Sequence, residues 1–101
     1  MATLDITRSG PVVRVFLNRP EVRNAFNSEV IAEMIGAFRE INADATLRAV
    51  VLGGHGKAFC AGGDLNWMRA MADYSWAENH ADAMALAEML WSVYACPHPV
   101  I

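Results

Sequence analysis

The side chains near the start of the chain follow the two-residue period of strands. In residues 12–17, Val13, Val15 and Leu17 alternate with Val12, Arg14 and Phe16, which is the pattern of a strand with one buried face. Residues 4–7 form a shorter run of the same kind, and the Ser-Gly-Pro sequence of residues 9–11 is typical of a turn. We therefore predict two strands joined as a hairpin. The side chains expected on the buried face of the second strand are Val13, Val15 and Leu17.

The spacing of apolar residues then changes to that of helices. Asn27 is a suitable N-cap for a helix that ends near Asn42. A second helical pattern covers residues 75–94 and stops before Pro97, and residues 65–71 predict a shorter helix between the two. The apolar side of the first helix contains Val30, Ile31, Met34, Ile35, Phe38 and Ile41. The acidic residues expected on the solvated side of the long helix are Asp73, Glu78, Asp82 and Glu88.

Residues 48–52 lie between the helical patterns and are mainly apolar, which is typical of a strand covered on both faces. We expect Gly53, Gly54 and Gly56 to break this strand, because glycine gives the backbone conformational freedom. The order strand, helix, strand predicts a βαβ unit with parallel strands and a right-handed crossover. Residues 99–101 resemble the start of a further buried strand. The predicted fold class is therefore α/β.

Two loops leave the C-terminal ends of the predicted parallel strands, at residues 20–25 and 53–63. Ligands of such sheets bind beyond these strand ends, so both loops are expected at one crevice. Gly62 and Gly63 stand just before a predicted helix, where bare peptide N–H groups form a site for an anion or a developing oxyanion. A plain tight turn is the alternative. The patterns of nucleotide-binding loops are excluded by three residues, Phe59, Val51 and Ala58.

Two sequence blocks resemble a known family. KAFCAGGDL (residues 57–65) resembles the oxyanion-hole motif of the crotonase (enoyl-CoA hydratase/isomerase) superfamily. LNRPEVRNAFN (residues 17–27) resembles the first strand-to-helix loop of the same family, and the resemblance extends over about residues 7–101. It implies a crotonase-type fold, a spiral of ββα units. It also implies that residues 1–101 form the N-terminal part of an acyl-CoA-binding domain and end before the catalytic acids.

The resemblance also implies roles for residues in the two blocks. The N–H group of Gly63 would be one of two that bind the thioester oxygen of an acyl-CoA. Arg23 would lie at the phosphates of the CoA nucleotide. Ala25 and Ala61 would let the backbone approach the adenine and the pantetheine closely. The residues assigned to substrate and CoA binding are Arg23, Ala25, Ala61, Gly62, Gly63, Asp64, Leu65 and Trp67.

Three residues after the glycine pair need separate interpretations. Asp64 is expected to cap the following helix and to hold the turn rather than to perform acid–base chemistry. Trp67 and Met68 either line an acyl pocket or pack in the core from one face of the helix, and the sequence leaves both alternatives open.

The activity that the resemblance implies is reversible hydration of an α,β-unsaturated acyl-CoA. GGDLNWM (residues 62–68) and ENHADAMALAEML (residues 78–90) most resemble the methylglutaconyl-CoA hydratase subgroup. The alternatives are an inactive N-terminal fragment with at most weak CoA binding, or another reaction of the family, such as that of an isomerase, a hydrolase or a decarboxylase. Members usually assemble as homotrimers or dimers of trimers. Coenzyme A enters as part of the substrate, and no metal or redox cofactor is implied.

Composition narrows the possible partners. Of 101 residues, 54% are hydrophobic and only 19% are charged, so the chain is more apolar than a small domain usually is. We expect the surplus to be buried against the rest of a longer chain or against other subunits. The net charge is −3 and the basic residues are scattered, which argues against nucleic acid. No apolar run approaches the roughly 20 residues that cross a membrane.

The cysteines and histidines predict neither a disulfide framework nor a metal site. Cys60 and Cys96 are expected to be small buried thiols, which fits a reducing, cytoplasmic compartment. His55, His80 and His98 are too far apart in the sequence to indicate a metal centre, and His55 is expected to be solvated in its glycine-rich loop.

Overall fold

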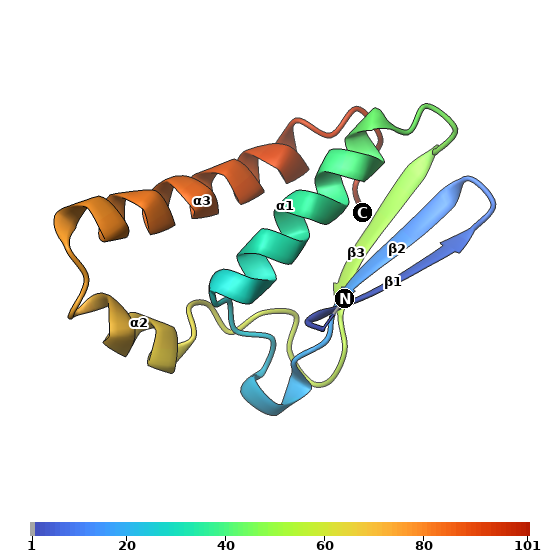
Figure 1. Cartoon of the computed structure of the whole chain (residues 1–101). Helices are drawn as coiled ribbons and strands as arrows, with labels where there is room; N and C mark the ends of the chain where they lie inside the picture. Colours follow the sequence, from blue (N-terminus) through green and yellow to red (C-terminus); the bar gives the residue numbers. More distant parts are fainter. Residues whose placement is uncertain (1) are drawn as a thin grey trace.

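The computed structural model describes residues 2–101. The elements are β1 (Leu4–Ser9), β2 (Val12–Leu17), a 3-10 turn η1 (Pro20–Val22), α1 (Ser28–Ala43), β3 (Ala49–Gly54), α2 (Leu65–Met71) and α3 (Trp76–Tyr94). The sheet has the order β1-β2-β3, in which the first pair is antiparallel and the second parallel. The predicted hairpin and the predicted parallel strand pair are both confirmed (Figure 1).

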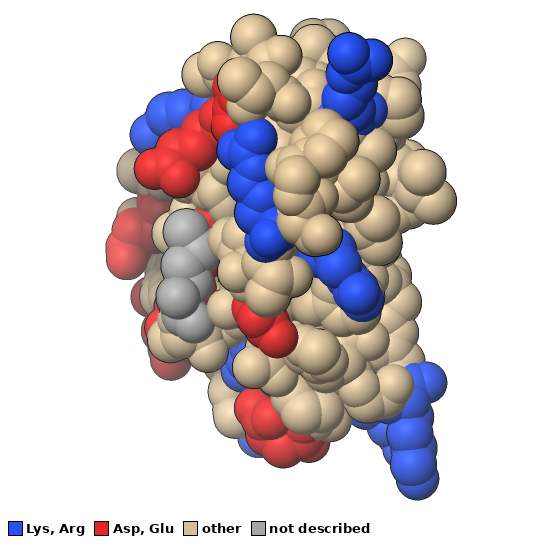
Figure 2. All heavy atoms as spheres, turned by 90° about the vertical axis from the view of Figure 1, so that its right-hand side faces the viewer, with Lys and Arg blue, Asp and Glu red and all other residues tan. Residues whose placement is uncertain are grey.

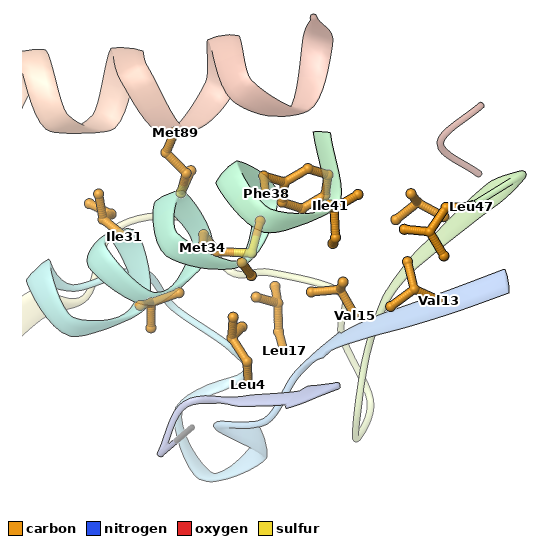
Figure 3. Packing of buried hydrophobic residues seen from close by; sticks show 13 residues of the cluster. Leu4, Val13, Val15, Leu17, Ile31, Met34, Phe38, Ile41, Leu47 and Met89 are labelled. Atoms are coloured by element: carbon orange, nitrogen blue, oxygen red, sulfur yellow. The ribbon is translucent and has the colours of Figure 1, made fainter. Parts of the chain in front are cut away.

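Helix α1 lies between the sheet and α3, so the core is built around it (Figure 3). Its apolar side packs on the buried face of β2, and Met89 reaches it from α3. Phe38, Val15 and Val50 are completely buried. The helix begins after Asn27, whose side chain accepts a hydrogen bond from the Val30 N–H at 3.0 Å, as the sequence predicted.

Strand β3 differs from the prediction in two ways. Val50 alone is buried and the other residues of the strand are half-buried, because no helix of residues 2–101 covers the far face of the sheet (Figure 1). The glycines at 53 and 54 continue the strand instead of breaking it, and they pair with Phe16 and Leu17. A Cβ atom on Gly53 would lie 2.7 Å from the Phe16 ring, so this glycine provides packing space. The expected break comes at Gly56, with φ +87°.

Helix α3 exposes most of its apolar surface. Met89 is its one buried residue, and Trp76, Trp91 and Tyr94 are strongly exposed at 79%, 64% and 83%. The helix begins with a complete capping box: the Ser75 side chain accepts a hydrogen bond from the backbone of Glu78, and the Glu78 carboxylate accepts one from the backbone of Ser75. Its start is therefore fixed locally and does not depend on packing.

The prediction for the acidic residues of α3 is wrong at one position. Glu78 and Glu88 are exposed, as expected, and so is Asp73 before the helix. Asp82 is half-buried and its Oδ2 atom is inaccessible to solvent, because the residue lies at a small cavity between α1, α2 and α3. The side of α3 that faces the other helices therefore includes a carboxylate.

The last residues add to the sheet beside β3. The Val50 N–H donates to the Pro99 carbonyl, and the Ile101 N–H donates to the Val50 carbonyl, each at 2.9 Å. Val100 thus forms an isolated parallel bridge with Val50, as the start of a further strand would. The expected burial is wrong for Ile101, which is 78% exposed.

Charged side chains of both signs are interspersed on the face of the molecule that carries the outer edge of the sheet (Figure 2). No helix of residues 2–101 is long and apolar enough to span a bilayer. Cys60 and Cys96 are free thiols and half-buried, so they are more accessible than the sequence indicated.

Candidate functional site

Two loops meet at the C-terminal edge of the sheet. Because Phe16 and Leu17 of β2 pair with Gly53 and Gly54 of β3, the chain leaves both strands at the same place (Figure 1). The loops are then joined by three backbone hydrogen bonds of 2.7–3.0 Å. Their donors and acceptors are Ala61 N to Arg23 O, Phe26 N to Gly62 O, and Asp64 N to Phe26 O. The predicted convergence of the two loops is confirmed.

Gly63 stands at the centre of this junction, opposite Phe26 in a parallel bridge. In such a bridge the hydrogen bonds are made by the residues on either side, here Gly62 and Asp64, so the N–H of the central residue points away from the partner strand. No acceptor for the Gly63 N–H is found among residues 2–101. Gly62 has φ +99°, which favours glycine and turns the chain at this point. The Gly63 N–H is therefore available to an acceptor from outside.

Asn24 fastens the two loops together, and the sequence interpretation did not identify it. Its side chain is almost completely buried, at 1% exposure. The Oδ1 atom accepts from the Arg19 N–H, and Nδ2 donates to the carbonyls of His55 and Ala58, each at 2.8 Å. Its backbone is left-handed, with φ +58°, a conformation that asparagine tolerates better than most residues. The sequence gives only a weak signal for this role, because Asn24 is one polar residue inside a loop and its partners lie 31 and 34 positions away.

Asp64 caps α2 and pairs with Arg19. Its Oδ1 atom accepts from the Trp67 N–H at 3.0 Å, which confirms the predicted cap. Its Oδ2 atom lies 3.1 Å from Arg19 Nη2, and the guanidinium also donates to the Ala25 carbonyl. The hydrogen bond from the Trp67 N–H and the one from Arg19 lower the pKa of Asp64 below its ordinary value. Asp64 is thus an ionised structural group, and Arg19 is a second residue that the sequence interpretation missed.

The other predicted residues fall into two groups. Arg23 and Ala61 are exposed at the loop junction, where Arg23 has left-handed backbone, and Ala25 is buried beside them with 6% exposure. Leu65 is 67% exposed at the start of α2, and Trp67 is half-buried against the core between the helices. The structure therefore brings Arg23, Ala25 and Ala61 to the junction with Gly63, and turns Trp67 away toward α1 and α3.

A cavity of about 570 Å³ opens beside the turn. Its walls are apolar side chains from β2, β3, α1 and α3, and its edge includes Phe59, Cys60 and Gly62. No Asp, Glu, His, Lys or Arg of residues 2–101 lines it. An apolar group in this cavity would lie beside the turn that carries the Gly63 N–H, in surroundings that strengthen a hydrogen bond to a developing negative charge.

The described part of the chain contains no group of three or more His, Cys, Asp or Glu side chains that could hold a metal ion. The His55 side chain is 42% exposed, as expected, and it is also held in place, because its Nε2 atom lies 2.9 Å from Asp5 Oδ2 and its ring packs on Phe16. The chemistry that these residues offer is backbone hydrogen bonding next to an apolar cavity.

Comparisons with known proteins agree with this arrangement. A family model described as enoyl-CoA hydratase/isomerase matches residues 7–101. A curated protein of Mycobacterium tuberculosis named as a probable enoyl-CoA hydratase, echA6, is 39% identical over 98 residues, which are 97% of this chain and 37% of that protein.

Solved structures resemble the fold closely. A crystal structure of an enoyl-CoA hydratase from Shewanella pealeana has a TM-score of 0.93 at 35% identity and is matched over 97% of this chain and 37% of its own. An enoyl-CoA hydratase from Mycobacterium smegmatis has a TM-score of 0.90 at 35% identity, over 97% and 38%. The fold expected from the sequence is thereby confirmed. The chain spans less than two fifths of the length of these relatives.

Proposed function

The chain belongs to the enoyl-CoA hydratase/isomerase (crotonase) family, and on this premise we propose that it is the N-terminal part of an enzyme that hydrates an α,β-unsaturated acyl-CoA. The observation that supports the proposal best is the outward-facing N–H of Gly63 beside an apolar cavity. The thioester oxygen would accept a hydrogen bond from this N–H, and the apolar part of the acyl group would occupy the cavity.

The proposed role of Gly63 follows from where charge develops. Addition of water to the double bond places negative charge on the thioester oxygen as the α-carbon becomes enolate-like. A preorganised donor at that oxygen lowers the barrier, and one such donor contributes about 3–4 kcal/mol in other enzymes. The acids that activate water, and a second donor, would come from parts of the enzyme outside these residues, since no acidic residue described here lines the cavity.

The loop junction is the proposed place of the CoA moiety. Arg23 is exposed there, so its guanidinium is free to approach a phosphate group. Ala25 and Ala61 leave the backbone on both sides of the junction without bulky side chains. Coenzyme A would therefore bind along the line where the two loops are joined, and the acyl end would extend past Gly63 into the cavity.

The experiment that tests the function replaces Gly63 in the complete enzyme. Gly63→Pro removes the N–H and breaks no hydrogen bond of the described structure, and it is expected to lower kcat for enoyl-CoA hydration by about 10²–10³-fold. Gly63→Ala is the matched control, because it keeps the N–H and its Cβ would meet Met68 Sδ at an ordinary 3.5 Å. Unchanged turnover in Gly63→Pro would contradict the oxyanion role.

A narrower proposal concerns the acyl group. The sequence resembles the methylglutaconyl-CoA hydratase subgroup around Trp67 and along α3. The acyl group of that substrate ends in a free carboxylate, and the apolar cavity has no cation among its lining residues. This substrate therefore requires a cation from elsewhere in the enzyme. Comparison of kcat/KM for methylglutaconyl-CoA with that for an enoyl-CoA of similar length and without a charged acyl group shows which of these two substrates the enzyme prefers.

The assembly and the alternatives also belong to this proposal. A homotrimer or dimer of trimers would cover part of the apolar surface of α3, and a cytoplasmic location is compatible with the free thiols. Light scattering of the complete enzyme measures its oligomeric state. If no enoyl-CoA is hydrated but an acyl-CoA is bound or otherwise converted, the isomerase, hydrolase or decarboxylase alternative replaces hydration. If residues 1–101 alone convert no acyl-CoA and bind it weakly at most, the inactive-fragment alternative holds for this chain.

A further inference from the structure

Gly63 would be a poor hydrogen-bond donor if its peptide groups were free to turn. Glycine has more backbone freedom than any other residue, and the residue before it in this turn, Gly62, is also a glycine. A donor that stabilises a developing charge acts best when its direction is fixed beforehand. The turn therefore needs a restraint from elsewhere in the chain, and the structure supplies one in the main chain of Phe26.

Both peptide groups next to the Gly63 Cα atom are bound to Phe26. The Phe26 nitrogen donates to the Gly62 carbonyl oxygen at 2.8 Å, and the Asp64 nitrogen donates to the Phe26 carbonyl oxygen at 2.7 Å. The first bond holds the peptide group between Gly62 and Gly63, and the second holds the one between Gly63 and Asp64. Phe26 is itself held in place, because it is half-buried and packs against the hydrophobic core.

The first of these bonds determines where the Gly63 N–H points. A peptide group is planar, and in its trans form the carbonyl and the N–H point in opposite directions. No peptide bond of residues 2–101 is cis, so the Gly62 carbonyl points toward Phe26 and the Gly63 N–H points away from it. The same bond polarises the peptide group, because hydrogen bonds in a chain strengthen one another, and it makes this N–H a stronger donor.

We propose that the main-chain N–H of Phe26 is a positioning group for catalysis, because it sets the direction of the Gly63 N–H through the Gly62 carbonyl. The inference rests on the function proposed above, in which the Gly63 N–H binds the thioester oxygen. The Phe26 N–H does not touch the substrate, since Gly62 already accepts its hydrogen bond. A change that removes only this N–H and leaves the Phe26 side chain intact therefore alters the reaction at Gly63.

The test makes this change in the complete enzyme. Phenyllactic acid in place of Phe26 keeps the side chain and replaces the N–H by an ester oxygen, which cannot donate. We expect kcat for enoyl-CoA hydration to fall by about tenfold with little change in KM, since misplacement of a catalytic group by about 1 Å can cost up to about 10²-fold. The matched control is 2-hydroxyisovaleric acid in place of Val50, which donates to Pro99 at the other isolated parallel bridge. This control removes a comparable hydrogen bond and is expected to leave kcat unchanged.

A second control deals with the carbonyl group that the ester also changes. The ester weakens the Ala25 carbonyl as an acceptor, and this carbonyl accepts a hydrogen bond from Arg19. Arg19→Met removes that hydrogen bond and keeps the Phe26 N–H, so its kcat should fall less than that of the ester variant. An equal or larger loss in Arg19→Met would assign the effect to the arginine and overturn the inference.

A spectroscopic measurement reports the hydrogen bond at the substrate directly. The probe is a saturated acyl-CoA with a ¹³C-labelled thioester carbonyl, whose infrared stretching frequency falls when its oxygen accepts a hydrogen bond. We expect binding to lower this frequency in the native enzyme and in the Val50 variant, and to lower it less in the Phe26 variant. An unchanged kcat or an undiminished frequency shift in the Phe26 variant would overturn the inference. Unchanged turnover in Gly63→Pro would instead reject the function on which it rests.

Discussion

At the residue scale, the turn at Gly63 is held in place by side chains that have a structural role and no proposed role in catalysis. Asn24 and Arg19 bond to backbone and carboxylate groups of both loops, and they do so from buried or half-buried positions. The glycine pattern of the turn could be predicted because glycine has a local reason to be there. The role of Asn24 could not be predicted. Its side chain joins the two loops only because the fold brings the carbonyls of His55 and Ala58 within hydrogen-bonding distance.

Replacement of Asn24 measures this fastening. Asn24→Gly keeps the left-handed backbone and leaves the Arg19 N–H and two carbonyls without partners, so the free energy of unfolding is expected to fall by about 1–3 kcal/mol. Urea denaturation provides the measurement. Arg23→Gly is the matched control, because Arg23 is also left-handed but exposed, and a loss as large as that of Asn24→Gly would contradict the interpretation.

The lowered pKa of Asp64 predicts a dependence of stability on pH. Because the folded pKa lies below the ordinary value of 3.8, ionised Asp64 stabilises the fold above pH 3.8, and this contribution is lost as the pH falls through the folded pKa. The stability difference between the native protein and Asp64→Asn should thus shrink on acidification, when unfolding is measured between about pH 7 and about pH 2. A difference that is constant over this range would refute it.

Asp44 does not disturb this comparison. Its hydrogen bonds with Thr46, together with Arg8, lower its pKa to about 2, so it also titrates in the acid range. It is present in both proteins, and its contribution cancels in the difference.

At the scale of elements, the helices and strands with a clear hydrophobic period could be predicted from the sequence. Which of their faces are buried and which are exposed to solvent could not. The caps of α1 and α2 and the break at Gly56 follow from local chemistry, and the structure confirms them. The burial of β3 and of Asp82 depends on what else packs nearby, which no spacing in the sequence reports. Asp82 has the pattern of a solvated helix position, but it is half-buried because it lines the small cavity between α1, α2 and α3.

The capping box of α3 makes a prediction at this scale. Ser75→Ala removes the side-chain acceptor for the Glu78 N–H, and it is expected to lower the free energy of unfolding by about 1 kcal/mol. Ser92→Ala is the same substitution inside the same helix, where Ser92 only bonds back to the Glu88 carbonyl, and it should be neutral or slightly stabilising. Equal effects of the two variants would show that the cap is not the reason.

At the scale of the whole molecule, one core joins the sheet to α1 and α3. Phe38→Ala empties its centre and is expected to cost about 3–5 kcal/mol, with the fluorescence and circular dichroism transitions shifting together. Phe59→Ala removes the same ring from a position that is 52% exposed and should cost far less. Separate transitions in the Phe38 variant would mean that the layers unfold independently.

The structure shows where the exposed apolar residues of this chain lie, which the amino-acid composition alone does not reveal. Of the eleven exposed large hydrophobic residues in the described part of the chain, five lie on α3. Among them are Trp91 and Tyr94, whose rings are tilted by 36° with centroids 5.7 Å apart. The amount of apolar surface could be inferred from residue counts. Its concentration on one helix could not, because that depends on which side of α3 meets α1.

The pairing of the two loops also determines when the site forms during folding. Arg19 and Asp64 are 45 positions apart, and the intervening chain includes α1 and the whole of β3. The β1–β2 hairpin closes a short loop and can nucleate early, whereas this contact requires the entropy of a long loop to be overcome first. We therefore expect the turn that carries Gly63 to be completed late, after β3 has docked on β2, and the hairpin to form well before it when the chain emerges from the ribosome.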